Sequence, residues 1–116
     1  MQYRHYRGKR PPRFAHPAEE ELAGLLDESG IPWEYEPHTF TLERSPDGVV
    51  RQAITPDFYL PDADTYIECT TMKQSNVNKK NQKVRKLRDR YGAIVTVLYA
   101  RDFRRLRRKY GSKVTS

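Results

Sequence analysis

The stretch that decides the fold is residues 54–71, which read ITPDFYLPDADTYIECTT. It contains two candidate strands, joined by a short polar turn that is built from Pro61, Asp62 and Asp64. The second run, residues 65–71, is rich in β-branched and aromatic side chains, which is typical of a strand. We therefore expect two paired strands at the centre of the protein.

Glu68 breaks the pattern of the second strand, because a carboxylate is unusual in the middle of such a run. Side chains alternate along a strand, so Glu68 shares a face with Tyr66 and Thr70, while Cys69 points to the other face. Asp57, at the end of the preceding strand, can approach Glu68 across the pairing. Two adjacent carboxylates repel unless a cation or a proton lies between them. This pair is the first candidate site.

Length and composition indicate one domain with a single core, in a chain of 116 residues. The one cysteine, Cys69, excludes an internal disulfide and a cysteine-rich zinc site. We see no apolar run long enough to span a bilayer and no signal peptide, and we expect a cytoplasmic protein with no membrane partner.

Charge is segregated along the chain. Residues 1–16 carry five Lys or Arg and no acid, residues 17–71 carry thirteen acids against two bases, and residues 72–116 carry fifteen bases against two acids. Basic ends around an acidic centre favour a polyanionic partner that the ends hold, and nucleic acid is the natural choice.

Residues 1–16 interleave basic and aromatic side chains and offer little apolar surface to bury. We interpret them as a flexible basic arm that either binds phosphates and stacks on bases or only solubilises the protein. Residues 17–116 then form the single folded domain.

The remaining sequence predicts alternating helices and strands. Helices are expected at residues 17–29, from a cap at 75 or 76 to 91, and at 103–110; strands are expected at 31–36, 39–43, 49–54, 65–71 and, as a buried strand, 93–100. The segment between residues 71 and 93 is long enough for a parallel crossover. The fold class is therefore α/β, with a mixed sheet and helices on its faces.

Two charged residues fall on apolar helix faces. At about 100° per residue, Glu19 projects near the apolar stripe that the leucines of the first helix form. Glu21 only flanks this stripe, and Glu20 points away from it. Lys80 falls about 40° from Val84, inside the apolar stripe of the second helix. Such a lysine needs a partner or a path to solvent.

Asp57, Glu68 and Glu19 together would form a ligand set made only of oxygens. Hard divalent cations, Mg²⁺ above all and also Mn²⁺, take carboxylates together with water and phosphate oxygens. Such an ion polarises a phosphate and activates an attacking water. With basic helices nearby, the chemistry that fits best is hydrolysis of phosphodiester bonds in nucleic acid.

The order of these residues resembles the PD-(D/E)XK nuclease superfamily. A Glu on the first helix, Pro56-Asp57-Phe58, and then a Glu on the next strand carry the likeness, which runs from about Glu19 to Ala100. The resemblance implies a restriction-endonuclease-like α-β-β-β-α-β core, here with an extra C-terminal helix, that binds Mg²⁺ and cuts DNA or less often RNA. It also makes a homodimer possible, because many such nucleases cut two strands as dimers.

The sequence departs from the family motif at Thr70, where the motif has lysine. Relocation of that lysine onto the following helix is known in the superfamily. Lys80 is one candidate for the displaced lysine because of its position on the apolar face of the helix. Lys73 is the other candidate, because it lies just after the strand. Alternatively, Thr70 only helps to position water, or the domain binds nucleic acid without cutting it.

The phosphate contacts are expected from the arm and the basic helices, at Arg4, Arg7, Arg10, Lys79, Lys83, Arg104 and Arg108. A third hypothesis, from a different functional class, is that the chain is a small basic protein that docks on an acidic protein or an RNA–protein assembly. Cleavage assays and the salt dependence of binding separate these hypotheses.

Overall fold

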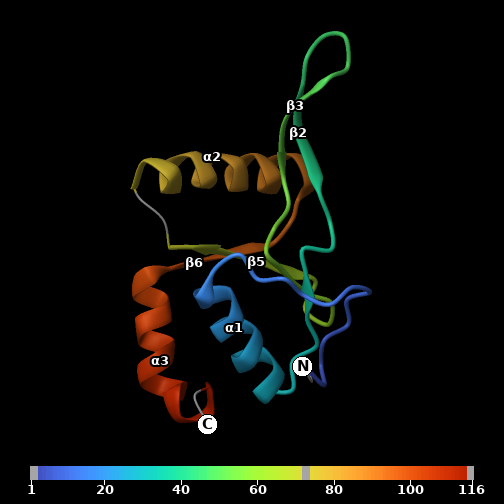
Figure 1. Ribbon diagram of the computed structural model, residues 1–116. Helices are drawn as coiled ribbons and strands as arrows, with labels where there is room; N and C mark the ends of the chain where they lie inside the picture. Colours follow the sequence, from blue (N-terminus) through green and yellow to red (C-terminus); the bar gives the residue numbers. More distant parts are fainter. Residues whose placement is uncertain (1–2, 72–73, 115–116) are drawn as a thin grey trace.

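The computed structural model describes residues 3–71 and 74–114 and shows an α+β fold with a mixed sheet and three helices (Figure 1). The helices are α1 (Pro17–Glu28), α2 (Gln74–Tyr91) and α3 (Ala100–Val114). The strands are β1 (Glu34–Tyr35), β2 (Phe40–Arg44), β3 (Val50–Ile54), β4 (Phe58–Leu60), β5 (Thr65–Thr70) and β6 (Val95–Tyr99).

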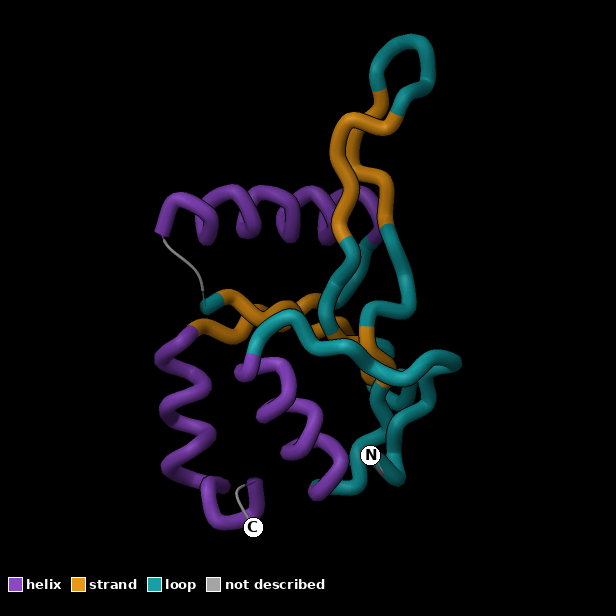
Figure 2. The backbone as a smooth tube through the Cα atoms, viewed as in Figure 1, coloured by secondary structure: helices purple, strands orange, loops and turns teal. Residues whose placement is uncertain are grey.

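The central sheet has the strand order β1-β4-β5-β6. β4 and β5 pair antiparallel with Phe58 opposite Ile67, which confirms the strand pair predicted from residues 54–71. β5 and β6 pair parallel with Glu68 opposite Val97, so α2 serves as the expected crossover. β2 and β3 form a separate antiparallel ribbon that projects away from the sheet (Figure 2).

Helices cover both faces of the sheet, with α2 on one side and α1 and α3 on the other (Figure 1). The alternation along β5 explains this arrangement. Tyr66 joins the buried cluster that includes Val84 and Leu87 of α2, whereas Ile67 and Cys69 join the cluster of α1 and α3. Glu68 shares the face of Tyr66 and therefore lies, buried, on the side of the sheet that α2 covers.

Three predicted elements need correction. The predicted strand 31–36 shrinks to Glu34–Tyr35, because Glu36 adopts a left-handed φ of 48° that ends it. β6 lies at the edge of its sheet, so of the apolar run predicted to be a buried strand only Val95 is buried. The last helix starts at Ala100 and ends at Val114, and is longer than the predicted 103–110.

The expected flexible arm is packed against the domain in the structure. Tyr6 forms a parallel bridge with Trp33, the backbone amide of Arg7 donates to the Trp33 carbonyl at 2.7 Å, and the Trp33 amide donates to the His5 carbonyl at 3.0 Å. The side chains of Tyr3, Tyr6 and Phe14 cover the α1–α3 cluster. Aromatic residues that looked like stacking platforms therefore complete the core.

Asp27 holds this N-terminal segment in place, and replacing it with alanine is expected to release the segment. Its carboxylate accepts the backbone amides of His5 at 2.8 Å and Arg4 at 3.1 Å, and the Trp33 indole N–H at 3.2 Å. We expect a loss of about 1–3 kcal/mol of stability, with faster tryptic cleavage after Arg4 and Arg7. Asp62→Ala, at an exposed turn position, is the control. Equal digestion of the two variants would contradict this anchoring role.

Candidate active site

Asp57, directly before β4, and Glu68, in β5, are linked by hydrogen bonds from backbone amides to their carboxylates. The backbone amide of Asp57 donates to Glu68 Oε1 at 3.0 Å, and the amide of Cys69 donates to Asp57 Oδ2 at 2.8 Å. Both side chains are buried, with exposed fractions of 7% and 3%. The β4–β5 register thus brings the two carboxylates into one buried acidic pair.

Lys80 reaches this pair from α2. Its ammonium lies 2.9 Å from Glu68 Oε2 and donates to the Cys69 carbonyl at 2.7 Å. Burial by itself lowers the pKa of Lys80, but the carboxylates of Glu68 and Asp57 outweigh it, and the net pKa is raised. Lys80 is therefore a charged lysine at a buried carboxylate, which explains its place on the apolar face of the helix.

One lysine does not neutralise two buried acids. Burial raises the pKa of Asp57, and the charge of Glu68 raises it further; the Cys69 amide and Lys80 only partly offset this. The same surroundings, burial first, raise the pKa of the Cys69 thiol, so this cysteine is no nucleophile at neutral pH. The site therefore favours an additional positive charge.

Asp57→Asn is expected to stabilise the metal-free protein at pH 8, by roughly 5 °C in Tm. The folded-state pKa of Asp57 lies above its unfolded value of about 3.9. The folded protein then binds more protons between these values, so its stability is present at low pH and is lost as the pH rises through the folded pKa. Asparagine removes this loss and still accepts the Cys69 amide.

Thermal unfolding from pH 5 to pH 8, with a chelator present, measures this effect. The stability advantage of Asp57→Asn over the wild type should grow with pH, whereas Asp62→Asn should show no such trend. An advantage that shrinks as the pH rises would contradict the proposed protonation of the pair.

A cavity of about 440 Å³ opens on the acidic pair between α2 and the end of β3. Its lining combines the two acids with three lysines of α2: Asp57, Glu68, Lys79, Lys80 and Lys83, together with Ala53, Ile54, Thr55 and Asn76. Lys83 also donates to the Ala53 carbonyl at 3.2 Å. Lysines around buried carboxylates can hold a phosphate next to a divalent cation.

The structure does not place Glu19 as the third ligand of this pair. Glu19 is buried as predicted, but its Oε1 accepts the Tyr35 hydroxyl at 2.6 Å and the Ala15 amide at 3.1 Å, and α1 covers the opposite sheet face. Within residues 3–71 and 74–114, no group of three or more His, Cys, Asp or Glu is arranged to hold a metal. Glu19 acts on the site only through its charge, which raises the pKa of Asp57 after larger contributions from burial and Glu68.

The metal expected from the sequence can still be tested against the donors that are present. Mg²⁺ is commonly held by one or two carboxylates and completes its shell with water and substrate phosphate oxygens. Asp57 and Glu68 supply two carboxylates, and the Cys69 carbonyl that contacts the Lys80 ammonium adds a third oxygen. This donor set fits Mg²⁺ or Mn²⁺ without Glu19.

Glu36 is an acid near the site that was not among the predicted site residues, although Tyr35-Glu36-Pro37 also carries part of the resemblance to the nuclease superfamily. Its amide donates to the Asp57 carbonyl at 2.9 Å, and its pKa is raised by partial burial and then by the charges of Glu19 and Glu68. The local signal was the Glu36-Pro37 pair after a strand, but only the pairing of β1 with β4 brings Glu36 to Asp57.

The other predicted residues are distributed over several surfaces. Lys73 lies outside the described residues. Arg4, Arg7 and Arg10 are exposed on the N-terminal segment, and Arg104 and Arg108 are exposed on α3. None of these five arginines lines the cavity of the acidic pair. Of the residues predicted to contact phosphates, Lys79 and Lys83 are the two that line this cavity.

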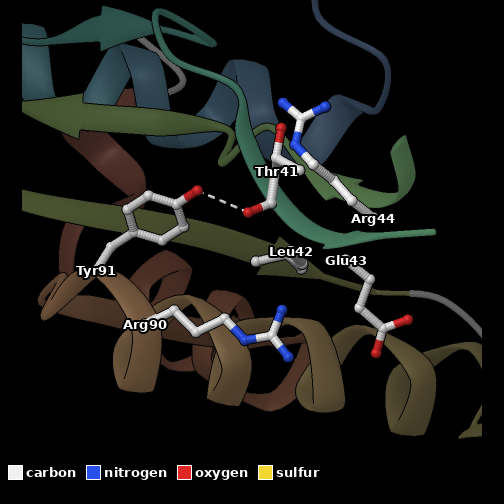
Figure 3. Close-up of a pocket in the computed structure, with 6 residues that line it drawn as sticks. All are labelled: Thr41, Leu42, Glu43, Arg44, Arg90 and Tyr91. Atoms are coloured by element: carbon white, nitrogen blue, oxygen red, sulfur yellow. Dashed lines mark hydrogen bonds between the residues drawn. The ribbon is translucent and has the colours of Figure 1, made fainter. Parts of the chain in front are cut away.

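A separate hollow of about 350 Å³ lies between the C-terminal end of α2 and β2 (Figure 3). The Tyr91 hydroxyl donates to the Thr41 carbonyl at 2.6 Å, and Lys86 contacts Glu43 and Gln52 nearby. These contacts attach the β2–β3 ribbon to α2. The hollow contains none of the predicted catalytic residues, so we assign it a structural role.

Comparison with protein-family models, curated proteins and solved structures found no match for this chain. Among the described residues, no helix is long and apolar enough to cross a membrane. The function of the protein is therefore inferred from the geometry of the site.

Proposed function

We propose that this protein is a Mg²⁺-dependent nuclease that hydrolyses phosphodiester bonds, with DNA the expected substrate ahead of RNA, and that its core is restriction-endonuclease-like. The observation that carries the proposal is the contact of Lys80 with Glu68, 2.9 Å between ammonium and carboxylate oxygen. It puts a lysine beside the acidic pair although the strand itself has Thr70 at the position of the motif lysine.

Each residue has a role in this reaction. Asp57 and Glu68 would hold the Mg²⁺ ion, which when bound supplies positive charge to the phosphate and acidity to a water molecule. Lys80 lines the same cavity, and its ammonium offsets negative charge that develops on the phosphate. Lys79 and Lys83 hold neighbouring phosphates of the strand. The raised pKa of Asp57 is consistent with a pair that requires a cation.

Cleavage of labelled DNA and RNA in the presence of Mg²⁺ or Mn²⁺ tests this function. Glu68→Gln should abolish cleavage and also remove the rise in Tm that Mg²⁺ gives the wild type. Glu28→Gln, at an exposed position of α1, is the matched control and should do neither. Absence of cleavage by the purified wild type on all of these substrates would refute the nuclease proposal.

A binding module without catalysis is the second candidate, and one observation favours it. The Lys80 ammonium is already held by Glu68 and by the Cys69 carbonyl, so it occupies two of the oxygens that a metal ion would use. In this case binding persists, falls with salt and is unaffected by Glu68→Gln. The cytoplasmic location and the homodimer expected from the sequence stay predictions.

A further inference from the structure

A second cavity, of about 470 Å³, lies where β5 and β6 end and α3 begins. Its wall includes Thr70 from β5, Asn81 from α2, Tyr99 from β6, and Ala100, Arg101 and Arg104 from α3. It is distinct from the cavity of Asp57 and Glu68, with which it shares no lining residue.

The wall of this cavity is rich in hydrogen-bond donors and contains no carboxylate. Arg101 is stacked over the Tyr99 ring at 4.8 Å, and the Tyr99 hydroxyl donates to Asn81 Oδ1 at 3.2 Å. That bond occupies the Asn81 oxygen and leaves its amide N–H groups as donors. Asp102, in the first turn of α3, accepts the Tyr99 amide at 2.7 Å and does not line the cavity, although its charge offsets part of the positive potential of the helix start.

The start of α3 adds a positive potential to the same wall. α3 has 15 residues, and its first residue, Ala100, lines the cavity. The first turn of a helix carries backbone N–H groups without partners inside the helix, and these groups bind anions. Most helix termini in proteins bind only water, so the side chains around this one decide whether it binds an anion.

Thr70 is a second feature of the cavity that indicates a bound ligand. It is 2% exposed and lines the cavity, and its hydroxyl is buried without a hydrogen-bond partner among the described residues. A buried hydroxyl without a partner costs free energy, so proteins rarely retain one. An acceptor that approaches Thr70 closely from the cavity would satisfy it.

We infer that this second cavity is a phosphate subsite, held by the Thr70 hydroxyl, the Asn81 amide, Arg104 and the start of α3. This inference rests on the proposed nuclease function. The bound phosphate then belongs to the nucleic acid strand that is cut, and it is the neighbour of the phosphate that lies at Asp57 and Glu68. Glu68 and Thr70 are two residues apart on one face of β5, about 7 Å along a strand. This separation is on the scale of the distance between successive phosphates of a nucleic acid strand.

The intact 116-residue chain can be tested with two probes. Titration with inorganic phosphate, followed by amide NMR, should shift the signals of Ala100 and Arg101 in the wild type and not in Thr70→Val. Anisotropy of a labelled oligonucleotide without divalent metal should show about five- to tenfold weaker binding by Arg104→Gln, with a salt slope lower by about one. Arg105→Gln, an exposed neighbour on α3 that does not line the cavity, should change affinity less than twofold.

Thr70→Val separates binding from folding. Valine has nearly the same shape as threonine, and loss of an unpaired hydroxyl leaves Tm unchanged or raised. We expect this folded variant to bind the oligonucleotide about threefold or more weakly. Wild-type affinity in both Thr70→Val and Arg104→Gln, with no phosphate-induced shifts, would overturn the subsite.

The outcomes also distinguish this inference from the nuclease proposal. A wild type that cuts DNA, with variants that bind normally, refutes the subsite and leaves the nuclease intact. A wild type that neither cuts nor binds nucleic acid, but whose Ala100 and Arg101 amides respond to phosphate, refutes the nuclease and supports a subsite for free phosphate. Absence of all these responses refutes both.

Discussion

Replacing Lys80 with methionine is expected to lower the rate of phosphodiester cleavage by about 10²- to 10³-fold, the usual cost of removing one group that stabilises developing charge. Methionine keeps most of the aliphatic length of the side chain but carries no charge. The rate should be measured in a single turnover with saturating protein and Mg²⁺, so that the chemical step rather than substrate binding is compared. Lys79→Met, which removes an exposed lysine of the same cavity, should mainly weaken binding.

Loss of Lys80 also leaves a buried charge at Glu68, whose exposed fraction is only 3%. Breaking a buried ion pair from one side typically costs about 3–5 kcal/mol; we expect less here because the Lys80 side chain is 19% exposed. The double variant Lys80→Met/Glu68→Gln removes both charges and should recover much of this stability. Because Glu68→Gln is itself expected to abolish cleavage, the double variant reports only on stability. A folded Lys80→Met single variant that cuts at the wild-type rate would refute the catalytic role of Lys80.

Lys73 provides the decisive comparison, since it was the other candidate for the displaced motif lysine. Lys73→Met should cut at nearly the wild-type rate if Lys80 is the relevant lysine. The reverse result, loss of activity in Lys73→Met and retention in Lys80→Met, would transfer the role to Lys73.

The pattern along the chain was sufficient for those parts of the site that depend on local periodicity. The alternation along β5 predicts that Glu68 and Cys69 point to opposite faces of the sheet, and the helical wheel predicts that Lys80 lies on the buried face of α2. The structure has both arrangements. Glu19 was also correctly predicted to lean inward. A wheel cannot show which partner a buried acid has, and Glu19 is bound by Tyr35 instead of joining Asp57.

Features that depend on neighbours in space were missed for physical reasons. An apolar run such as VTVLY in β6 records hydrophobicity but not the number of adjacent strands, and β6 has β5 on one side only. Glu36 reaches Asp57 because β1 pairs with β4, and these two strands are far apart in the sequence. The basic composition of residues 3–16 suggested a free arm, but a few aromatic side chains are enough to pack it against Trp33.

Trp33→Ala is expected to cost about 3–5 kcal/mol of unfolding free energy, a large share of the roughly 5–15 kcal/mol available to a domain. Trp33 has an exposed fraction of 0% and contacts the rings of Tyr3, Tyr6, Phe14 and Phe58 at centroid distances from 4.6 to 6.3 Å. It therefore joins the N-terminal segment to the sheet. Urea denaturation, with the slope compared between variants, measures the loss.

Trp33→Phe tests whether this loss comes from packing or from the indole hydrogen bond. Phenylalanine keeps an aromatic ring but lacks the N–H that reaches Asp27 at 3.2 Å. We expect it to retain most of the stability that alanine loses, apart from a cavity cost and about 1 kcal/mol for the hydrogen bond. If Trp33→Ala costs less than about 1 kcal/mol, the cavity it leaves must be filled or exposed at little cost. Residues 3–16 would then not be packed on Trp33 in solution, and their arginines would be free to reach a nucleic acid after all.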